Sequence, residues 1–195
     1  NSSFGKWHLG ALARDPGLNH PQPSQQGFDY SFGTESNAVP SHHNPKNFVR
    51  NGNVLGVIDG YACQIVANEG IDWLNQRNEK APFFMYFAFH EPHAVVASPQ
   101  ELVDKYQDQP EKDAKYLANI DHLDMAIGRI LNYLEQNDLI DNTIIMFSSD
   151  NGSYRVASNG GLRAGKSSLY EGGIHVPGII RWPEITTEKK VIETS

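Results

Sequence analysis

The chain has 195 residues, which is enough for one domain with a sizeable hydrophobic core. Its formal net charge of −7 at pH 7 argues against a general nucleic-acid-binding protein, because such proteins need a basic stripe to neutralise phosphates. The single cysteine, Cys63, excludes an internal disulfide, and no apolar stretch is long enough to span a membrane. An anionic partner would therefore be met by a few local cations.

The first predicted element is the segment FGKWHLG at residues 4–10. In an extended chain the side chains of Lys6 and His8 point to one side and that of Trp7 points to the other. An ammonium and an imidazole placed together would grip an anion. The alternative is an ordinary pair of surface side chains on an edge strand.

Residues 15–53 are rich in Pro, Asn, Ser, Gln, His and Gly and show no sustained period, so we expect a long loop. Its aromatic residues, among them Phe28 and Phe48, favour an ordered, packed excursion that contacts the substrate. Several polar side chains of this loop could either bind a sugar or lie on the surface: Asn37, His42, His43, Asn44 and Arg50.

The rest of the chain alternates predicted helices and strands. Apolar residues recur at spacings of three and four from about residue 113 to 137, which predicts a long amphipathic helix, and a shorter helix is predicted at 59–79. Strands are predicted at 81–90, 142–150 and 175–182. The first two are apolar enough to be covered on both faces. This alternation predicts an α/β sandwich with a mainly parallel central sheet flanked by helices.

Polar side chains follow two of these strands, and ligands of open α/β sheets bind outside the carboxyl ends of the strands. The first strand runs into His90, Glu91 and His93, and the second runs into Asp150 and Asn151. A carboxylate beside an amide supplies two hard oxygen donors of the kind that Ca²⁺ or Mg²⁺ prefers. The alternative is an Asp-Asn-Gly turn formed for backbone reasons alone.

The segment GLRAGKSSLYEGG at 161–173 places Lys166 in a glycine-rich loop. Such a loop suggests a bound phosphate, but its spacing is not that of a nucleotide-binding Walker loop. Tyr154 and Arg155 follow the Asp-Asn pair closely enough to line a substrate cleft. Arg163 could support the lysine loop.

Taken together, these segments resemble the sulfatase family of the alkaline phosphatase superfamily. FGKWHLG matches a signature of that family, and PFFMYFAFHEPH is similar to its strand leading to an active-site histidine. SSDNG is similar to its metal-binding Asp-Asn pair, and LRAGKSSLYEGGIHVP to its lysine loop. The motifs occur in the family's order over nearly the whole chain. The resemblance implies an alkaline-phosphatase-like fold.

The resemblance also implies roles for individual side chains. Lysines would hold the sulfate oxygens, and a histidine would protonate the leaving oxygen, which gains charge as the S–O bond breaks. His8 would contact the nucleophile region, whereas His90 and Glu91 are expected only to shape the loop. The implied residues are Lys6, His8, His93 and Lys166 for catalysis, Lys6, His93, Lys166, Tyr154 and Arg155 for substrate binding, and Asp150 and Asn151 for Ca²⁺.

Two parts of the family pattern are absent from this sequence: the Cys/Ser-x-Pro-x-Arg motif that yields the formylglycine nucleophile, and the paired aspartates of the calcium site. Cys63 does not substitute, because it has neither the proline nor the arginine. His175 stands where relatives often carry arginine, which puts a loop-anchoring salt bridge in doubt. We therefore expect an internal part of a catalytic domain, truncated at both ends and inactive alone. The alternative is a short protein that keeps only a sulfate-binding surface.

The expected function is hydrolysis of sulfate esters, those of a sulfated carbohydrate above all, with Ca²⁺ as cofactor. Two alternatives stay open: a catalytically inactive sulfated-glycan-binding protein, and a phosphodiesterase or phosphonate hydrolase of the same superfamily. By resemblance, the expected location is secreted, periplasmic or lysosomal. The substrate and the oligomeric state are left open.

Overall fold

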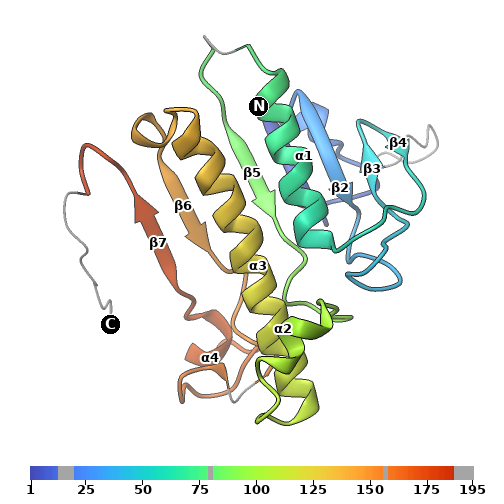
Figure 1. Cartoon of the computed structure of the whole chain (residues 1–195), viewed down its shortest axis with the longest axis vertical. Coiled ribbons are helices and arrows are strands. Elements are labelled where there is room, and N and C mark those ends of the chain that lie inside the picture. Colours follow the sequence, from blue (N-terminus) through green and yellow to red (C-terminus); the bar gives the residue numbers. More distant parts are fainter. Residues whose placement is uncertain (13–19, 79–80, 156–157, 187–195) are drawn as a thin grey trace. The chain divides into compact units, whose positions relative to one another are not determined.

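The computed structural model describes residues 1–12, 20–78, 81–155 and 158–186 (Figure 1). The chain forms two compact units, Asn1–Tyr133 and Leu134–Ser195. The first unit contains a five-stranded sheet, and the second contains a two-stranded sheet. In chain order the strands are β1 (Ser2–Lys6), β2 (Tyr30–Thr34), β3 (Val49–Arg50), β4 (Asn53–Val54), β5 (Met85–Ala88), β6 (Ile145–Ser148) and β7 (Gly178–Arg181).

Helices lie between several of these strands along the chain. The α-helices are α1 (Ala62–Gln76), α2 (Gln100–Asp104), α3 (Glu111–Gln136) and α4 (Glu171–Ile174), and two short 3₁₀-helices are η1 (Pro23–Gln26) and η2 (Ile140–Asn142). The fold class predicted from the sequence is therefore confirmed as α/β, with a mixed sheet flanked by helices.

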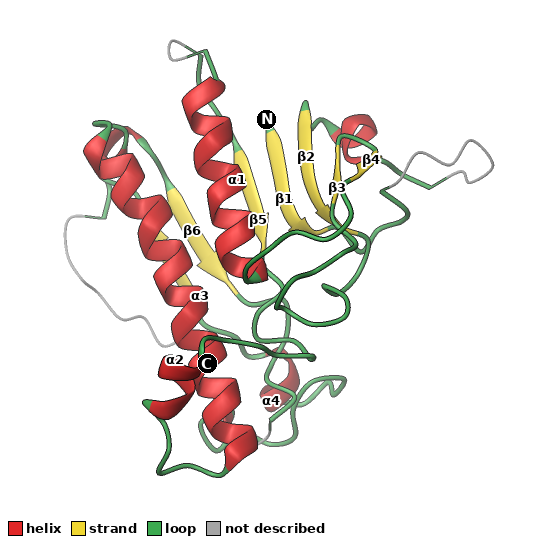
Figure 2. Ribbon diagram, turned by 45° about the vertical axis from the view of Figure 1, so that its right-hand side comes forward, coloured by secondary structure: helices red, strands yellow, loops and turns green. Residues whose placement is uncertain are grey.

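The sheet of the first unit has the order β4-β3-β2-β1-β5 (Figure 2). Strand β1 pairs in parallel with both β2 and β5, so that Phe4 lies in register with Phe32 and with Phe87. The rings of Phe4 and Phe87 stack with their centroids 4.9 Å apart. This aromatic row packs with Val66 of α1 in the main core cluster. Burying such large apolar side chains is the main source of folding free energy here.

Both predicted helices are confirmed, with shifted ends. Helix α1 is shorter than the predicted 59–79, and residue 79 lies outside the described part of the chain. Helix α3 begins two residues before the predicted start. Its predicted apolar stripe is largely buried at Tyr116, Ile130 and Leu134, but Ile120 is 40% exposed. Cys63 and Ala67 of α1 pack against Ala126 and Ile130 of α3.

All three predicted strands exist as β5, β6 and β7. The burial on both faces that was expected for the first two is wrong. Strand β5 ends the five-stranded sheet, and Tyr86 at its centre is 49% exposed because it points away from the α1 face. Met146 of β6 is 77% exposed. Strand β7 pairs antiparallel with β6, so the mainly parallel arrangement expected for the sheet holds only for β2, β1 and β5.

The expected long loop at 15–53 is partly wrong, because it contains β2 and β3. Strand β2 is the sequence YSFGT, and its Phe32 is 1% exposed in the core. Two buried neighbours, Phe48 and Val49, anchor the following segment, which supports the expected ordered packing. Residues 15–19 of this range lie outside the described part of the chain.

None of the described helices combines the length and the apolar character needed to cross a bilayer.

Candidate active site

Lys6 is the last residue of β1, at the carboxyl end of the parallel strands. Its Nζ donates a hydrogen bond of 3.0 Å to Oδ1 of Asn37, a residue 31 positions further along the chain. Gly5 precedes it with a φ of +95°, and a Cβ there would lie 2.0 Å from the carbonyl oxygen of Ala88. The glycine is therefore required for β1 to approach the end of β5, where the histidine-bearing loop begins.

His8 lies two residues beyond the strand. The expected extended conformation ends at Lys6, because His8 adopts a φ of +52° and its amide donates to the carbonyl of Glu35 at 2.9 Å. The expected separation of faces is nevertheless observed for Trp7, which is buried and donates its indole N–H to the carbonyl of Pro21 at 3.0 Å. The imidazole of His8 is exposed.

The loop after β5 brings two histidines to the end of the sheet. His90 is buried, and its Nε2 lies 2.7 Å from Oγ1 of Thr34. The hydroxyl of Thr34 already donates to the carbonyl of Ser36 at 2.5 Å, so Nε2 of His90 is the donor of the pair. Burial above all, together with electrostatic interaction with His42, Lys6 and His93, lowers the pKa of His90 to about 3. His90 is therefore a neutral structural residue, as expected from the sequence.

His93 is only partly buried. Its Nδ1 lies 2.8 Å from the carbonyl oxygen of Ala94, and because a carbonyl can only accept, Nδ1 carries a proton. Nε2 is then the nitrogen left to meet a ligand, and it becomes a proton donor when the ring is protonated. Strand β1 ends at Lys6, and its parallel neighbour β5 ends at Ala88 before the loop that carries His93, so both side chains belong to the same end of this sheet.

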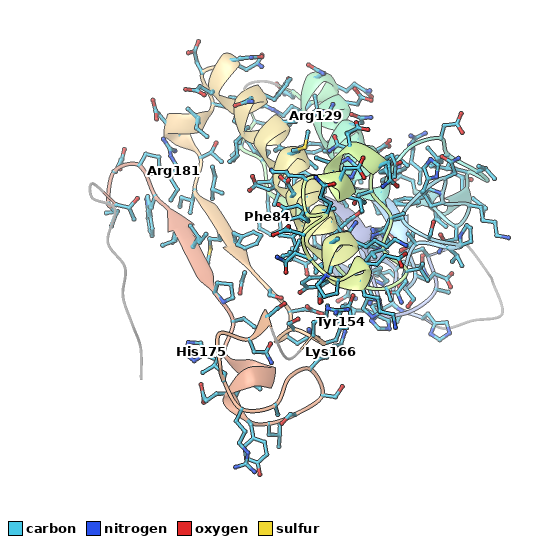
Figure 3. All side chains as sticks on the ribbon, turned by 60° about the horizontal axis from the view of Figure 1, so that its bottom comes forward. Phe84, Arg129, Tyr154, Lys166, His175 and Arg181 are labelled. Atoms are coloured by element: carbon cyan, nitrogen blue, oxygen red, sulfur yellow. The ribbon has the colours of Figure 1, made fainter. Side chains whose placement is uncertain are left out.

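The second unit contains the Asp-Asn pair and the lysine loop, and Figure 3 labels Lys166 of that loop. Asp150 follows β6 and is exposed, and the side-chain N–H of Asn151 donates to the carbonyl of Gly152 at 3.2 Å. A Cβ on Gly152 would lie 1.9 Å from the carbonyl oxygen of Gly172. The amide of Lys166 donates to the carbonyl of Ser153 at 3.0 Å. Backbone contact therefore brings the metal-ligand candidates and Lys166 into one loop cluster.

The flanking candidates occupy the same loop cluster. Tyr154 is 43% exposed, and the amide of Arg155 donates to Oγ of Ser153 at 2.9 Å. The guanidinium of Arg163 lies 3.4 Å from the ring centroid of Tyr170, and its carbonyl accepts from the amide of Gly172 at 2.8 Å. Arg163 thus supports the lysine loop.

The predicted site residues fall in both units: Lys6, His8 and His93 in the first, and Asp150, Asn151, Tyr154, Arg155 and Lys166 in the second. The sulfatase family model matches residues 1–195. The chain belongs to the sulfatase family.

Relatives within the family agree with this assignment. An uncharacterized sulfatase, YdeN of Escherichia coli K12, is 29% identical over 93% of this chain and 36% of its own length. Human N-acetylgalactosamine-6-sulfatase is 28% identical over 96% of this chain and 38% of its own length. The crystal structure of Ps i-CgsB in complex with k-i-k-neocarrahexaose superposes with a TM-score of 0.81 at 27% identity, covering 94% of this chain and 44% of that one. The chain thus spans less than half the length of these sulfatases.

The expected Ca²⁺ prefers oxygen ligands, and the second unit offers donors of this type. Asp150 offers a carboxylate, and Asn151 keeps its side-chain oxygen available because its N–H is the bonded group. Ca²⁺ takes about six to eight oxygen ligands, so these two residues could supply only part of such a shell. Among the described residues, no cluster of three or more His, Cys, Asp or Glu side chains could hold a metal.

Cys63 does not have the properties of a nucleophile. It is fully buried in α1, and its thiol lies 3.6 Å from the carbonyl oxygen of His122. Burial, and next to it the charge of Glu91, raise the pKa of the thiol far above its usual range. A reactive cysteine needs the opposite, an accessible thiolate with a lowered pKa. The structure therefore agrees with the sequence in excluding Cys63 from catalysis.

The polar residues of the long loop have mostly structural partners. His42 is fully buried and cannot bind a sugar, and Arg50 pairs with Glu69 at 2.5 Å. Asn37 binds Lys6, as described above. His43 is exposed and stacks on Tyr61 with the ring centroids 4.6 Å apart. Of the two histidines in this set, His43 is the exposed one.

Proposed function

We propose that the protein is a sulfuric ester hydrolase that acts on a sulfated carbohydrate. The observation that carries the proposal is that Lys6 ends β1 and His93 follows β5, the parallel neighbour of β1, at the same end of the sheet in a chain of the sulfatase family. Support for a carbohydrate comes from Ps i-CgsB, whose structure contains k-i-k-neocarrahexaose. The human relative is named for an N-acetylgalactosamine sulfate.

In this mechanism a lysine ammonium holds a non-bridging oxygen of the sulfate, and Lys6 and Lys166 are the proposed candidates. The Nζ of Lys6 is oriented by Asn37, and the backbone of Lys166 is bonded to Ser153. Fixed cations of this kind stabilise the charge that develops as the S–O bond breaks, without having to reorganise during the reaction.

His93 then supplies the proton for the departing alcohol. Its Nδ1–H is held by the carbonyl of Ala94, so the transferable proton is at Nε2 of the imidazolium. After transfer the ring is neutral with Nδ1–H retained, which is the tautomer that the carbonyl of Ala94 favours. His8 is proposed to contact the region of the nucleophile.

Asp150 and Asn151 would hold Ca²⁺, which when bound would supply positive charge to stabilise an anionic substrate. The formylglycine motif is not among the residues of this sequence. We accordingly propose that the site residues of this sequence bind the sulfate ester. Hydrolysis of the ester additionally requires the formylglycine nucleophile. The proposed location is secreted, periplasmic or lysosomal.

The test is calorimetric titration of the protein with inorganic sulfate and with a carrageenan oligosaccharide in the presence of Ca²⁺. We expect saturable binding that Lys6→Ala weakens by roughly tenfold or more, because a charge-assisted hydrogen bond is lost. Lys46→Ala is the matched control, since Lys46 is an exposed lysine of the long loop. An equal effect of the two substitutions, or no binding at all, would refute the proposal.

Hydrolysis distinguishes the remaining functions. Sulfate release from a sulfated oligosaccharide by the full-length protein supports the proposal. Binding without release would favour a glycan-binding protein, and faster hydrolysis of 4-nitrophenyl phosphate than of 4-nitrophenyl sulfate would favour a phosphoester or phosphonate hydrolase.

A further inference from the structure

A buried acid lies within the turn that carries His93. The side chain of Glu91 is fully buried, and its Oε1 accepts a 2.9 Å hydrogen bond from the amide of Cys63 in the first turn of α1. Tyr61, the N-cap residue that precedes this helix, forms no capping hydrogen bond with its side chain. Glu91 therefore caps α1 from a different element, and a negative group is favoured there by the helix dipole.

His42 connects the same two elements from the other side. Its side chain is fully buried, and its Nδ1 lies 3.6 Å from Oε1 of Glu91, which is too long for a hydrogen bond. Its amide donates to the carbonyl of Val95 at 3.2 Å, and its carbonyl accepts from the amide of Ala62 at 2.7 Å. The loop after β5 and the start of α1 are thus joined twice, once through Glu91 and once through the backbone of His42.

The side chains of His42 and Glu91 form a buried polar pair with incomplete hydrogen bonding. Both ring nitrogens of His42 and Oε2 of Glu91 have no hydrogen-bond partner among the described residues. Burial raises the pKa of Glu91 to about 7 and lowers that of His42 to about 4. The other titratable groups that act on the pair or on its neighbours are Lys6, Cys63, His90, His93 and His122.

The turn from His90 to His93 is held at its first two residues. The amide of His93 donates to the carbonyl of His90 at 2.9 Å, which closes the turn. The side chain of His90 is fixed on Thr34, and that of Glu91 is fixed on Cys63. The ring of His93 is left partly exposed and can meet a ligand.

We propose that Glu91 is a positioning residue, which fixes His93 relative to Lys6 by anchoring the turn on the amide of Cys63. This inference rests on the proposed function, because His93 matters as a sulfate contact. It adds a second element, helix α1, to the support of the site, and it gives a role to a buried carboxyl that the proposed chemistry does not use.

The test compares Glu91→Ala, Glu91→Gln and the control Glu69→Gln in the protein. Glu69 is a buried acid like Glu91, but it lies within α1 and is bound by Arg50 and Tyr30. Two measurements are made without ligand: hydrogen exchange of the Cys63 amide, and the NMR shifts of the His93 ring. Sulfate titration follows.

We expect Glu91→Ala to accelerate exchange of the Cys63 amide by about tenfold or more, because its acceptor is removed. The ring shifts of His93 should change, and sulfate affinity should fall by about tenfold, since a small misplacement of a contact group is costly. Glu91→Gln keeps an acceptor oxygen and should restore the slow exchange and the affinity. Glu69→Gln should alter none of the three readouts.

A pH titration keeps the inference testable if Glu91→Ala does not fold. The Cys63 amide shift of the wild-type protein should titrate with a midpoint of about 7, following the carboxyl that it contacts, and Glu91→Gln should abolish this step. A step that persists in Glu91→Gln, or an Ala variant with wild-type exchange and ring shifts, would overturn the inference. Expected effects on Cys63 and His93 with no sulfate binding by the wild type would instead refute the proposed function and leave the anchoring role standing.

Discussion

The side chains around His93 gain their properties from burial more than from direct pairing. Lys6 has a hydrogen-bond partner in Asn37, whereas His42 and His90 are neutral because the interior disfavours their charged forms. The sequence predicted Lys6 and His93 as site residues through their resemblance to the family motifs. It gave no indication that Asn37 orients Lys6, because contacts between residues far apart in the chain leave no local pattern.

The buried histidines predict acid sensitivity. His90 has a pKa of about 3 in the folded chain, below its ordinary value of 6.5, so the unfolded chain binds an extra proton between these values. The contribution of neutral His90 to the free energy of unfolding is therefore present above pH 6.5 and is lost as the pH falls toward 3. We expect His90→Gln to reduce the loss of unfolding free energy between pH 6.5 and 4.5 by about 2 kcal/mol.

Urea unfolding at the two pH values measures this difference, and His43→Gln serves as the control because His43 is exposed. Equal acid sensitivity of wild type and His90→Gln would contradict the assignment of His90 as a neutral buried group.

At the level of elements, apolar patterns in the sequence predicted the positions of helices and strands, but they did not predict how the strands pair. The long apolar stripe correctly predicted α3, and continuous apolar runs located β5 and β6. Strand β2 was missed because YSFGT is short, with Ser and Gly among its residues, so its period was masked. The antiparallel pairing of β7 with β6 also could not be predicted, since strand direction depends on contacts between residues distant in sequence.

The loops of the second unit predict a strict requirement for glycine. A Cβ at position 152 would overlap the carbonyl oxygen of Gly172, and backbone atoms cannot yield as a flexible side chain can. We expect Gly152→Ala to destabilise this unit by at least about 2 kcal/mol and to separate the Asp150 loop from the Lys166 loop. Gly160→Ala is a control, since an added Cβ there meets no atom within 4 Å, although its φ of +61° carries a small backbone cost of its own. Equal melting temperatures for the two variants would contradict the proposed close contact.

At the scale of the whole molecule, the division into two units means that stability need not be lost in a single step. The first unit contains the aromatic core and the only cysteine of the sequence, whereas the second contains the Asp-Asn pair and the lysine loop. The family was recognised from motifs spread over both units. How stability divides between the units could not be predicted, because it depends on packing and not on motif order.

Cys63 provides a measurement restricted to the first unit. Because the thiol is fully buried and its pKa is raised by burial, we expect almost no alkylation by iodoacetamide in the native protein at pH 8. Labelling in increasing urea should follow the unfolding of the first unit alone, and circular dichroism should report both units. Rapid alkylation without denaturant would show that α1 and α3 do not cover the thiol.

The position of Trp7 between the two candidate anion-binding side chains has a practical consequence. Its indole is buried and held by the carbonyl of Pro21, directly after Lys6 and before His8. An oxyanion arriving at those neighbours would alter the electric field at the ring, and thereby its fluorescence emission. With Trp73 and Trp182 replaced by phenylalanine, the protein would carry an intrinsic optical sensor of ligand arrival that needs no attached dye.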